Sequence, residues 1–401
     1  MARQTTRARV LLGTRPVGTL SFRSGRSAFR YEDLEPDHPI LGLAFEYDPE
    51  AATGQVTGVP SWFANLLPER GSALRRIYNQ RLGREAHDFL LLVYLGHDLP
   101  GAVVVEAEGE LPQNMSEALE EADAAAQNET LGFSLSGMQL KFSMQEDGST
   151  FRLPANKGEL GDWIVKLPST VLPDLPANEH LTMSWAKSIG IDVPEHRLVP
   201  LTAVTGVDED YLEGGTTAFA IRRFDRTPSG ERVHQEDFTQ VFDVLPAQKD
   251  HGRHEDIARV LLDNCPQDFD EYVRRIVLCI AAGNNDEHLK NWSLRYADSQ
   301  TPRLSPAYDM LSATAYKAFQ RQGLTLSIGE QKDMRYITRD HFSRFAEAVE
   351  TNPAPVLAVV DEAVANLHHT LPTVADTAGA PEFVISHLRE RLERLPLMRR
   401  N

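Results

Sequence analysis

Apolar and polar residues alternate over short runs at the start of the chain. The runs lie within residues 8–46 and read ARVLLGTRPVGTLSF, SAFRYED and ILGLAFEY. Such alternation, interrupted by turn residues, is typical of antiparallel strands with one buried face. We therefore predict a small antiparallel sheet in this part of the chain.

The pattern then changes to helical spacing, in which apolar residues recur every three or four positions. Two segments show it, SWFANLLPERGSALRRIYNQR and EAHDFLLLVYL, and a strand-like GAVVVE follows them. These elements predict a first unit over residues 1–105. The next segment, residues 106–130, contains eight acidic residues and neither lysine nor arginine. Because it offers little that could fill a core, we predict an acidic linker with a short helix after Ser116.

Two further units follow this linker. Residues 131–225 have strand patterns around one amphipathic helix, NEHLTMSWAKSIGI, whereas residues 226–401 have helical spacing almost throughout. A strand-rich lobe followed by an all-α lobe predicts an α+β fold with a cleft between the lobes.

Composition narrows the possible functions. The 401 residues include 41 basic and 58 acidic side chains, for a net charge of −17. Nucleic-acid binding by this chain alone is not expected, because phosphate contacts need a positive face. Two cysteines are too few for a disulfide scaffold or a cysteine-based zinc site. No apolar run suggests a signal peptide or a membrane span, and we predict a cytoplasmic protein.

A polar stretch, NNDEHLKN, follows the apolar run IVLCIAAG directly. Asp286 and Asn291 are five positions apart, the spacing at which kinase catalytic loops hold a carboxylate and an Mg²⁺ ligand. Lys290 lies between them, where a cation could steady a transferring phosphoryl group. The alternative is an Asx-type turn that leaves the helix IVLCIAAG.

Three charged residues outside this stretch fit the same chemistry. Asp309, in LSPAYDML, could return as a second metal ligand, or it could cap the following turn. Lys166, in the apolar strand DWIVKLPS, would need an anion such as a nucleotide phosphate unless the strand lies at a sheet edge. Glu179, at the start of the helix NEHLTMSWAK, is a candidate partner for that lysine.

Two further stretches have a structural and a functional interpretation. The turn in FSLSGMQLKFS could aim backbone N–H groups at an anion, or it could be a simple hairpin. AFAIRRFDR could be a hinge between lobes that offers backbone groups to an adenine, or the last strand of a sheet.

Taken in order, these elements resemble the HipA-type serine/threonine kinases, the toxins of bacterial HipBA toxin–antitoxin modules. VGTLSF, SWFANLLPERG and LLVYLGHDLPGAVVV resemble the N-terminal subdomain of the family. SLSGMQLKFS is similar to its phosphate-binding loop, WIVKLPS to its ATP-lysine strand and FAIRRFDR to its hinge. VHQEDFTQVF, NNDEHLKNWSL and LSPAYDML follow in the order of the family.

The resemblance implies a two-lobed kinase-like fold and a role for each matching residue. Asp286 would be the catalytic aspartate and Lys290 a second catalytic residue, with Asn291 and Asp309 as Mg²⁺ ligands. ATP would contact Lys166, which Glu179 would pair. The further ATP-binding positions implied are Gly137, Met138, Gln139, Arg222, Phe224 and His288. Ser134 and Ser136 would be the candidates for inactivating autophosphorylation.

The function implied is an ATP- and Mg²⁺-dependent protein serine/threonine kinase that inhibits growth. Its implied substrate is an aminoacyl-tRNA synthetase, whose phosphorylation would block translation. The implied partner is a small helix-turn-helix antitoxin, which would supply the DNA contact. Two alternatives are an inactive kinase-fold binding or regulatory module and a small-molecule kinase.

Overall fold

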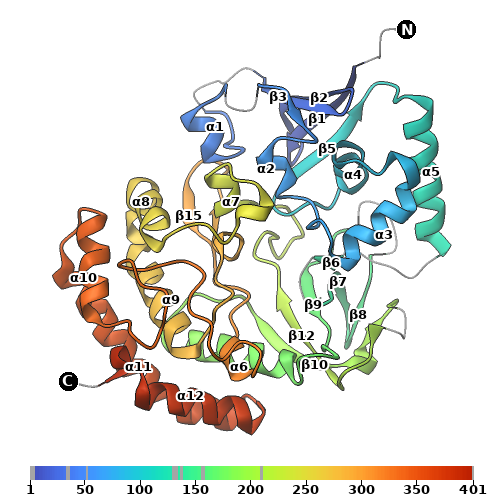
Figure 1. Ribbon diagram of the computed structural model, residues 1–401. Helices are drawn as coiled ribbons and strands as arrows, with labels where there is room; N and C mark the ends of the chain where they lie inside the picture. Colours follow the sequence, from blue (N-terminus) through green and yellow to red (C-terminus); the bar gives the residue numbers. More distant parts are fainter. Residues whose placement is uncertain are drawn as a thin grey trace.

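The computed structural model describes residues 5–32, 37–50, 53–128, 134–135, 139–154, 159–207 and 211–399. Within these ranges the chain forms three sheets and a large helical layer (Figure 1). The predicted α+β class and the two lobes with an added N-terminal subdomain are confirmed. The helical lobe additionally contains a small sheet of three strands.

The N-terminal subdomain is built on an antiparallel sheet with the strand order β4-β3-β2-β1-β5. Its strands are β1 (Thr6–Leu12), β2 (Arg15–Arg23), β3 (Arg26–Tyr31), β4 (Val56–Thr57) and β5 (Val103–Glu108). In β1 the side chains of Ala8 and Val10 are buried whereas those of Arg7 and Arg9 are exposed, as the alternating pattern predicts.

Five helices accompany this sheet. They are α1 (Leu43–Tyr47), α2 (Ser61–Ala64), α3 (Ala73–Leu82), α4 (Asp88–Leu95) and α5 (Gln113–Asn128). Helix α5 occupies most of the segment for which we predicted an acidic linker, and it is longer than the short helix expected after Ser116. Its Met115, Ala118 and Ala122 pack into the core of the subdomain, while Glu117, Glu120 and Glu121 are exposed.

The second sheet has the order β10-β12-β9-β7-β8-β11, and β6 also pairs with β7. Its strands are β6 (Ser134–Leu135), β7 (Lys141–Asp147), β8 (Thr150–Arg152), β9 (Trp163–Lys166), β10 (His196–Pro200), β11 (Val204–Thr205) and β12 (Thr217–Arg222). Strand β9 lies between β12 and β7, so Lys166 is not on an edge strand. One face of this sheet packs in its own core, which includes Phe142, Trp163 and Val165.

Helix α6 (Leu175–Ser188) connects this sheet to the helical lobe. Its Leu181 and Trp185 share one core with Phe219 of β12 and with the helices of the C-terminal half. The Trp185 indole also donates a hydrogen bond to the Leu367 carbonyl at 3.3 Å. The helix therefore fixes the position of the strand-rich lobe on the helical lobe.

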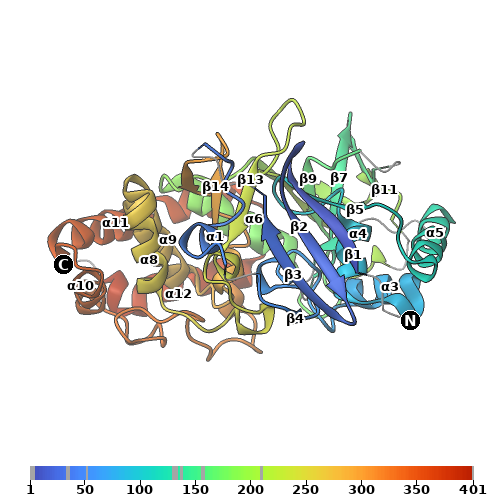
Figure 2. The ribbon, with the colours of Figure 1, turned by 90° about the horizontal axis from the view of Figure 1, so that it is seen from above.

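The helical lobe is formed by elements that follow β12 in the sequence. Its helices are α7 (Phe238–Val241), α8 (His254–Asn264), α9 (Phe269–Ala282), α10 (Arg339–Ala348), α11 (Pro353–Thr377) and α12 (Glu382–Arg394). Its small sheet is formed by β13 (His234–Asp237), β14 (Ser293–Tyr296) and β15 (Pro302–Leu304). Helix α9 contains the run IVLCIAA and is buried among its neighbours, with α8 and α11 packed against it (Figure 2).

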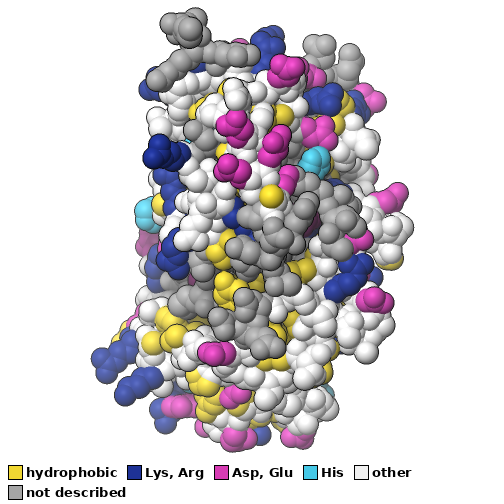
Figure 3. Space-filling model, turned by 90° about the vertical axis from the view of Figure 1, so that its right-hand side faces the viewer, with side chains coloured by type: hydrophobic (Ala, Val, Ile, Leu, Met, Phe, Trp, Pro, Cys, Tyr) yellow, Lys and Arg dark blue, Asp and Glu magenta, His cyan; other side chains and the backbone are white. Residues whose placement is uncertain are grey.

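On the face that carries α5, acidic and basic side chains are interspersed (Figure 3). No helix among the described ranges is both long enough and apolar enough to span a bilayer.

Candidate active site

A cleft of about 1020 Å³ lies where the second sheet, the helical lobe and the N-terminal subdomain meet. The sheet contributes Lys166, the helical lobe contributes Asp286 and Asp309, and the N-terminal subdomain contributes the segment 65–72. This volume is at the upper end for small-molecule sites, which leaves room for a nucleotide and an acceptor group.

Lys166 lies at one wall of the cleft and contacts two carboxylates. Its ammonium forms ion pairs with Glu179, in the first half of α6, and with Asp309. The lysine and Glu179 are 5% and 1% exposed, so both charges are shielded from water. A buried ion pair of this kind persists only when each charge is compensated.

Lys141 is a second cation at this wall, and its role was not predicted from the sequence. It is the register partner of Lys166 on the neighbouring strand β7. Two lysines directly opposite each other repel, but the Asp309 carboxylate lies between them. One of its oxygens contacts Lys166, and the other accepts a hydrogen bond from Lys141 Nζ at 3.2 Å. The signal for Lys141 was its alternation in LKFSM, which places it on the same face as Ser143 and opposite Phe142.

The charges of this cluster shift one another's protonation. Burial alone would lower the pKa of Lys166, but Asp309 and Glu179 outweigh it and raise that pKa. Burial would raise the pKa of Asp309, but Lys141 and Lys166 hold it well below its usual range. Lys166 and Asp309 are therefore both charged at neutral pH. Asp309 has a φ of 53°, a left-handed conformation that aspartate tolerates better than most residues.

The NNDEHLKN stretch begins where α9 ends. Gly283 ends the helix in a left-handed conformation, with a φ of 73°. A Cβ atom at this position would lie 1.8 Å from the Thr314 hydroxyl oxygen, so the close approach requires glycine. The Asn284 side chain accepts a hydrogen bond from the Asp286 N–H at 3.3 Å. An Asx turn is thus present, but Asn284 makes it, and the Asp286 carboxylate remains 65% exposed in the cleft.

Burial and the neighbouring charges act on the pKa of Asp286 in opposite directions. Desolvation by the cleft walls raises its pKa, and the nearby charges of His288 and Lys249 oppose this shift. His288 Nε2 lies 3.8 Å from the Asp286 carboxylate, and burial lowers the pKa of that imidazole. Because a raised pKa makes a carboxylate a better proton acceptor, Asp286 suits a general base.

Asn291 lies in the 3₁₀ turn Leu289–Asn291, at the floor of the same cleft. Its amide nitrogen donates a hydrogen bond to the Asp286 carbonyl at 2.6 Å. This bond fixes the orientation of the side chain and leaves its amide oxygen available for a cation.

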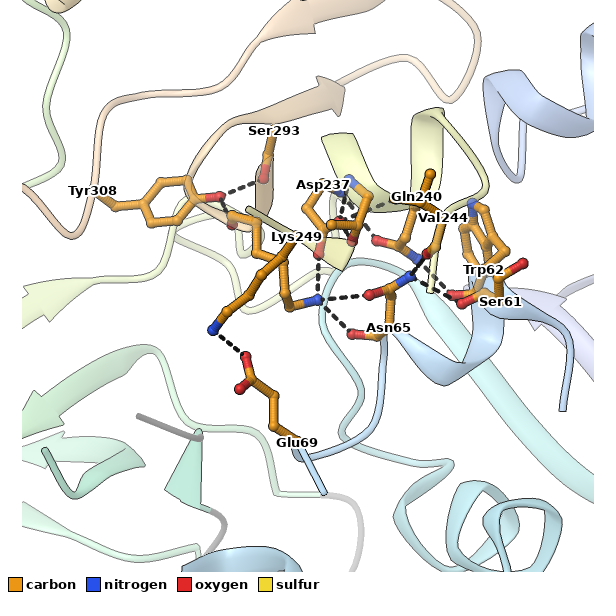
Figure 4. Close-up of polar contacts among 12 residues, drawn as sticks. Ser61, Trp62, Asn65, Glu69, Asp237, Gln240, Val244, Lys249, Ser293 and Tyr308 are labelled. Atoms are coloured by element: carbon orange, nitrogen blue, oxygen red, sulfur yellow. Dashed lines mark hydrogen bonds and ion pairs between the residues drawn. The ribbon is translucent and has the colours of Figure 1, made fainter. Parts of the chain in front are cut away.

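Lys290 lies in the same turn, but its ammonium is bonded to residues outside the loop. Its ammonium contacts the Asp237 carboxylate at 2.7 Å and the Asn65 carbonyl at 2.9 Å. Figure 4 shows Asp237 at the start of α7 and Asn65 just after α2. The lysine therefore joins the loop to the N-terminal subdomain.

The predicted hinge, AFAIRRFDR, comprises most of β12 and the four residues after it. Phe224 lines the cleft, and its ring centroid lies 5.5 Å from that of Tyr308. Arg222 lies over the Trp163 ring and 3.6 Å from the Asp162 carboxylate. The alternative, a last strand with exposed arginines, does not describe Arg223, which is buried against Asp225.

The predicted phosphate loop is described only in part. Gln139 donates a hydrogen bond to the Leu167 carbonyl at 2.6 Å, which ties the end of the loop to β9. The backbone of Ser134 lies in β6, opposite Phe142 of β7. Ser136, Gly137 and Met138 lie outside the described residues.

The residues at this cleft fit Mg²⁺ and a nucleotide. In the described part of the chain, no group of three or more His, Cys, Asp or Glu side chains could hold a metal alone. Asp309 and Asn291 offer one carboxylate and one amide oxygen, the oxygen ligands that Mg²⁺ takes alongside phosphate and water. Lys166 and Lys141 offer the positive charge that phosphate groups need.

Two family models match this chain, and together they span most of it. The HipA N-terminal domain matches residues 8–106, and the HipA-like C-terminal domain matches residues 133–371. The second match contains the cleft residues Lys166, Asp286 and Asp309.

Curated relatives include two putative kinases of Sinorhizobium fredii. The putative kinase Y4dM is 40% identical over 368 residues, which cover 87% of each chain. The putative kinase Y4mE is 29% identical over 71% of each chain.

Among solved structures, the chain resembles one of the toxin–antitoxin complex of HipA, HipB and operator DNA from Shewanella oneidensis MR-1. The TM-score is 0.73 at 20% identity, with 97% of this chain and 96% of that chain covered. At this identity the similarity establishes the fold.

Proposed function

The chain belongs to the HipA family, and we propose that it is an ATP- and Mg²⁺-dependent protein serine/threonine kinase acting as a growth-inhibiting toxin. One observation carries the proposal. Lys166, paired with Glu179 and Asp309, faces the same cleft as Asp286 and Asn291. Phosphoryl transfer needs a cation for the phosphates, metal ligands and a group that orients the acceptor hydroxyl, and this cleft holds a candidate for each.

Each side chain has a distinct task in this proposal. Lys166 and Lys141 would turn from Asp309 to the nucleotide phosphates, and Asp309 and Asn291 would hold Mg²⁺. When bound, Mg²⁺ supplies positive charge that offsets the charge of the phosphate groups. Asp286 would accept the proton of the acceptor hydroxyl, a role favoured by its raised pKa. Most of the acceleration would come from positioning and electrostatics.

Partners follow from the family and from the charge of the chain. We propose a helix-turn-helix antitoxin as partner, which would supply the DNA contact that a chain of net charge −17 is poorly suited to make. The structurally similar HipA was solved with HipB and operator DNA. The proposed substrate is an aminoacyl-tRNA synthetase, and it rests on the family resemblance.

Autophosphorylation at Ser134 or Ser136 would switch the kinase off. Strand β6 pairs with β7 so that Leu135 lies opposite Lys141, one strand away from Lys166. A phosphoserine adds about −1.5 to −2 charges next to the lysines that the ATP phosphates would otherwise contact.

The test is phosphate transfer from labelled Mg-ATP by the purified protein. Wild type is expected to label itself at Ser134 or Ser136, and Asp286→Asn is expected to lower the rate by about 100-fold or more. Asp376→Asn, an exposed position at the end of α11, is the matched control. A wild-type protein that binds Mg-ATP but phosphorylates neither itself nor any synthetase would instead be a binding module. Transfer only to a metabolite would make it a small-molecule kinase.

A further inference from the structure

All three N–H groups of the Lys290 ammonium already have an acceptor, so none is free for a phosphate group. Its ammonium has three N–H donors, and the structure provides three acceptors for them. They are Asp237 Oδ2 at 2.7 Å, the Asn65 carbonyl at 2.9 Å and Asn65 Oδ1 at 3.4 Å. A contact with a transferring phosphoryl group would require this lysine to leave one of them.

The acceptors of Lys290 are themselves fixed in orientation. Asn65 is 6% exposed, and its amide nitrogen donates to the Val244 carbonyl at 2.8 Å and the Ser61 carbonyl at 3.0 Å. The second oxygen of Asp237 caps α7 by accepting from two backbone N–H groups of that helix. Figure 4 shows this arrangement around Asn65 and Asp237. Lys290 is thus a positioning residue, which fixes the catalytic loop to the N-terminal subdomain.

Lys249 is placed where a cation could reach the reacting groups. Its carbonyl accepts a hydrogen bond from the Leu289 N–H at 3.0 Å, so its backbone lies against the loop that carries Asp286. Lys249, Asp286 and His288 line the same cleft. The positive charge of Lys249 also lowers the pKa of Asp286, which supports their proximity.

The Lys249 side chain is held far less tightly than that of Lys290. Among the described residues, its ammonium has one partner, Glu69 Oε1 of the N-terminal subdomain, at 2.7 Å (Figure 4). The two side chains are 24% and 32% exposed. Partly exposed ion pairs are weak, so a phosphate group can replace Glu69 with little loss.

We propose that Lys249 contacts the transferring phosphoryl group, and that Glu69 holds this lysine until nucleotide and acceptor enter the cleft. The inference rests on the proposed kinase function and assigns the cationic role to Lys249 instead of Lys290. Lys141 and Lys166 contact Asp309 and are the lysines proposed above to bind the phosphates of the nucleotide. Lys332 also lines the cleft, and its ammonium donates to the Thr325 carbonyl. A compact ammonium on a flexible stem suits the charge that spreads over the phosphoryl oxygens during transfer.

The experiment compares Lys249→Met, Lys249→Arg and Lys290→Met with wild type, using Lys187→Met on the exposed end of α6 as control. Two readouts are the rate of phosphate incorporation from Mg-ATP and calorimetric binding of Mg-ADP with and without aluminium fluoride. Lys249→Met is expected to lower the rate about 100-fold and to abolish the gain in affinity from aluminium fluoride. Its affinity for Mg-ADP alone and its melting temperature should match those of wild type.

The remaining variants separate a direct contact from a structural one. Lys249→Arg is expected to recover part of the rate, and Glu69→Gln to raise it, because Lys249 is then released. Lys290→Met is expected to lower the melting temperature, because it leaves buried acceptors unpaired.

An active wild type with an equally active Lys249→Met would overturn the assignment and leave the kinase proposal intact. A Lys249→Met variant that loses stability and Mg-ADP affinity together would overturn it as well. A wild type that transfers no phosphate and gains no affinity from aluminium fluoride would overturn the kinase proposal itself.

Discussion

A buried charge is stable only where partners replace the lost water, and two buried groups of this chain meet that need differently. Lys166 has two carboxylates and stays charged. Glu236 is fully buried and has neutral donors: the Leu43 N–H at 3.0 Å, the Trp62 indole at 3.2 Å and the Tyr296 hydroxyl at 2.5 Å. Burial therefore raises the pKa of Glu236 to about 7, although these hydrogen bonds oppose the shift.

This shift makes stability depend on pH. The ordinary pKa of the group is 4.5, so between this value and about 7 the folded chain binds the proton more tightly than the unfolded chain. The stability contributed by neutral Glu236 is complete below the lower value and is lost as pH rises through the higher one. As pH rises from about 5.5 to 8.5, we expect wild type to lose unfolding free energy and Glu236→Gln, which cannot titrate at this position, to keep it. The difference between the two should shift by about 2 kcal/mol in favour of Glu236→Gln over this range.

Urea unfolding across this pH range measures the effect, with Glu362→Gln on the exposed face of α11 as control. A constant difference between wild type and Glu236→Gln at all pH values would contradict the prediction.

For single residues, the sequence predicted which kind of group a side chain needs better than it predicted which residue supplies that group. The apolar strand around Lys166 indicated that this lysine needs an anion, and Glu179 was named as one candidate. Lys141, which becomes the neighbour of Lys166 only through strand register, was missed. Lys290 was predicted to lie near the phosphoryl group because of its position between Asp286 and Asn291. Sequence spacing could not reveal that Asn65, more than 200 residues earlier, takes up its hydrogen bonds.

At the scale of elements, the junction between α9 and the loop after it depends on Gly283. Thr314, in the segment that follows Asp309, donates its N–H to the Gly283 carbonyl at 3.1 Å. Gly283→Ala would combine a left-handed conformation with a steric clash against the Thr314 side chain. We expect a loss of more than about 1–2 kcal/mol in unfolding free energy, and slower phosphate transfer because the loop must shift.

Gly190, after α6, provides the matched comparison. It has a φ of 84°, and a Cβ atom there would meet no heavy atom within 4 Å. Gly190→Ala should therefore cost only the conformational part of the penalty and leave phosphate transfer unchanged. Equal losses of stability in the two variants would show that contact with Thr314 is unimportant.

The periodicity of apolar residues predicted most elements, but it did not predict that α5 packs against the N-terminal subdomain. Its acidic residues concealed a narrow apolar stripe of Met115, Ala118 and Ala122. Alanine and methionine are compatible with both a solvated helix and a packed one. Only the neighbouring surface of the N-terminal subdomain decides between these possibilities.

At the scale of the whole molecule, buried charges attach the hinge to the N-terminal subdomain. Asp225 is 3% exposed and is contacted by Arg223 at 2.7 Å and by Arg226 at 3.0 Å. It also accepts a hydrogen bond from the Gly101 N–H at 2.9 Å, across the boundary with the N-terminal subdomain.

Asp225→Ala would leave both arginines buried without this partner. We expect a loss of about 3–5 kcal/mol in unfolding free energy, measured by urea denaturation. Asp376→Ala, an exposed substitution, should change it by less than about 0.5 kcal/mol. A similarly small effect of Asp225→Ala would mean that Asp98, which also contacts Arg223 and Arg226, is a sufficient partner for both arginines.

The contact of Lys290 with Asp237 and Asn65 has a consequence for sequence variation within the family. Because three positions from distant parts of the chain share one set of hydrogen bonds, a change at one of them favours a compensating change at another. Among relatives, positions 65, 237 and 290 should therefore vary together or not at all. A chimera that joins the N-terminal subdomain of one relative to the kinase lobes of another should fold and transfer phosphate only when its residues at positions 65, 237 and 290 can form this set of hydrogen bonds.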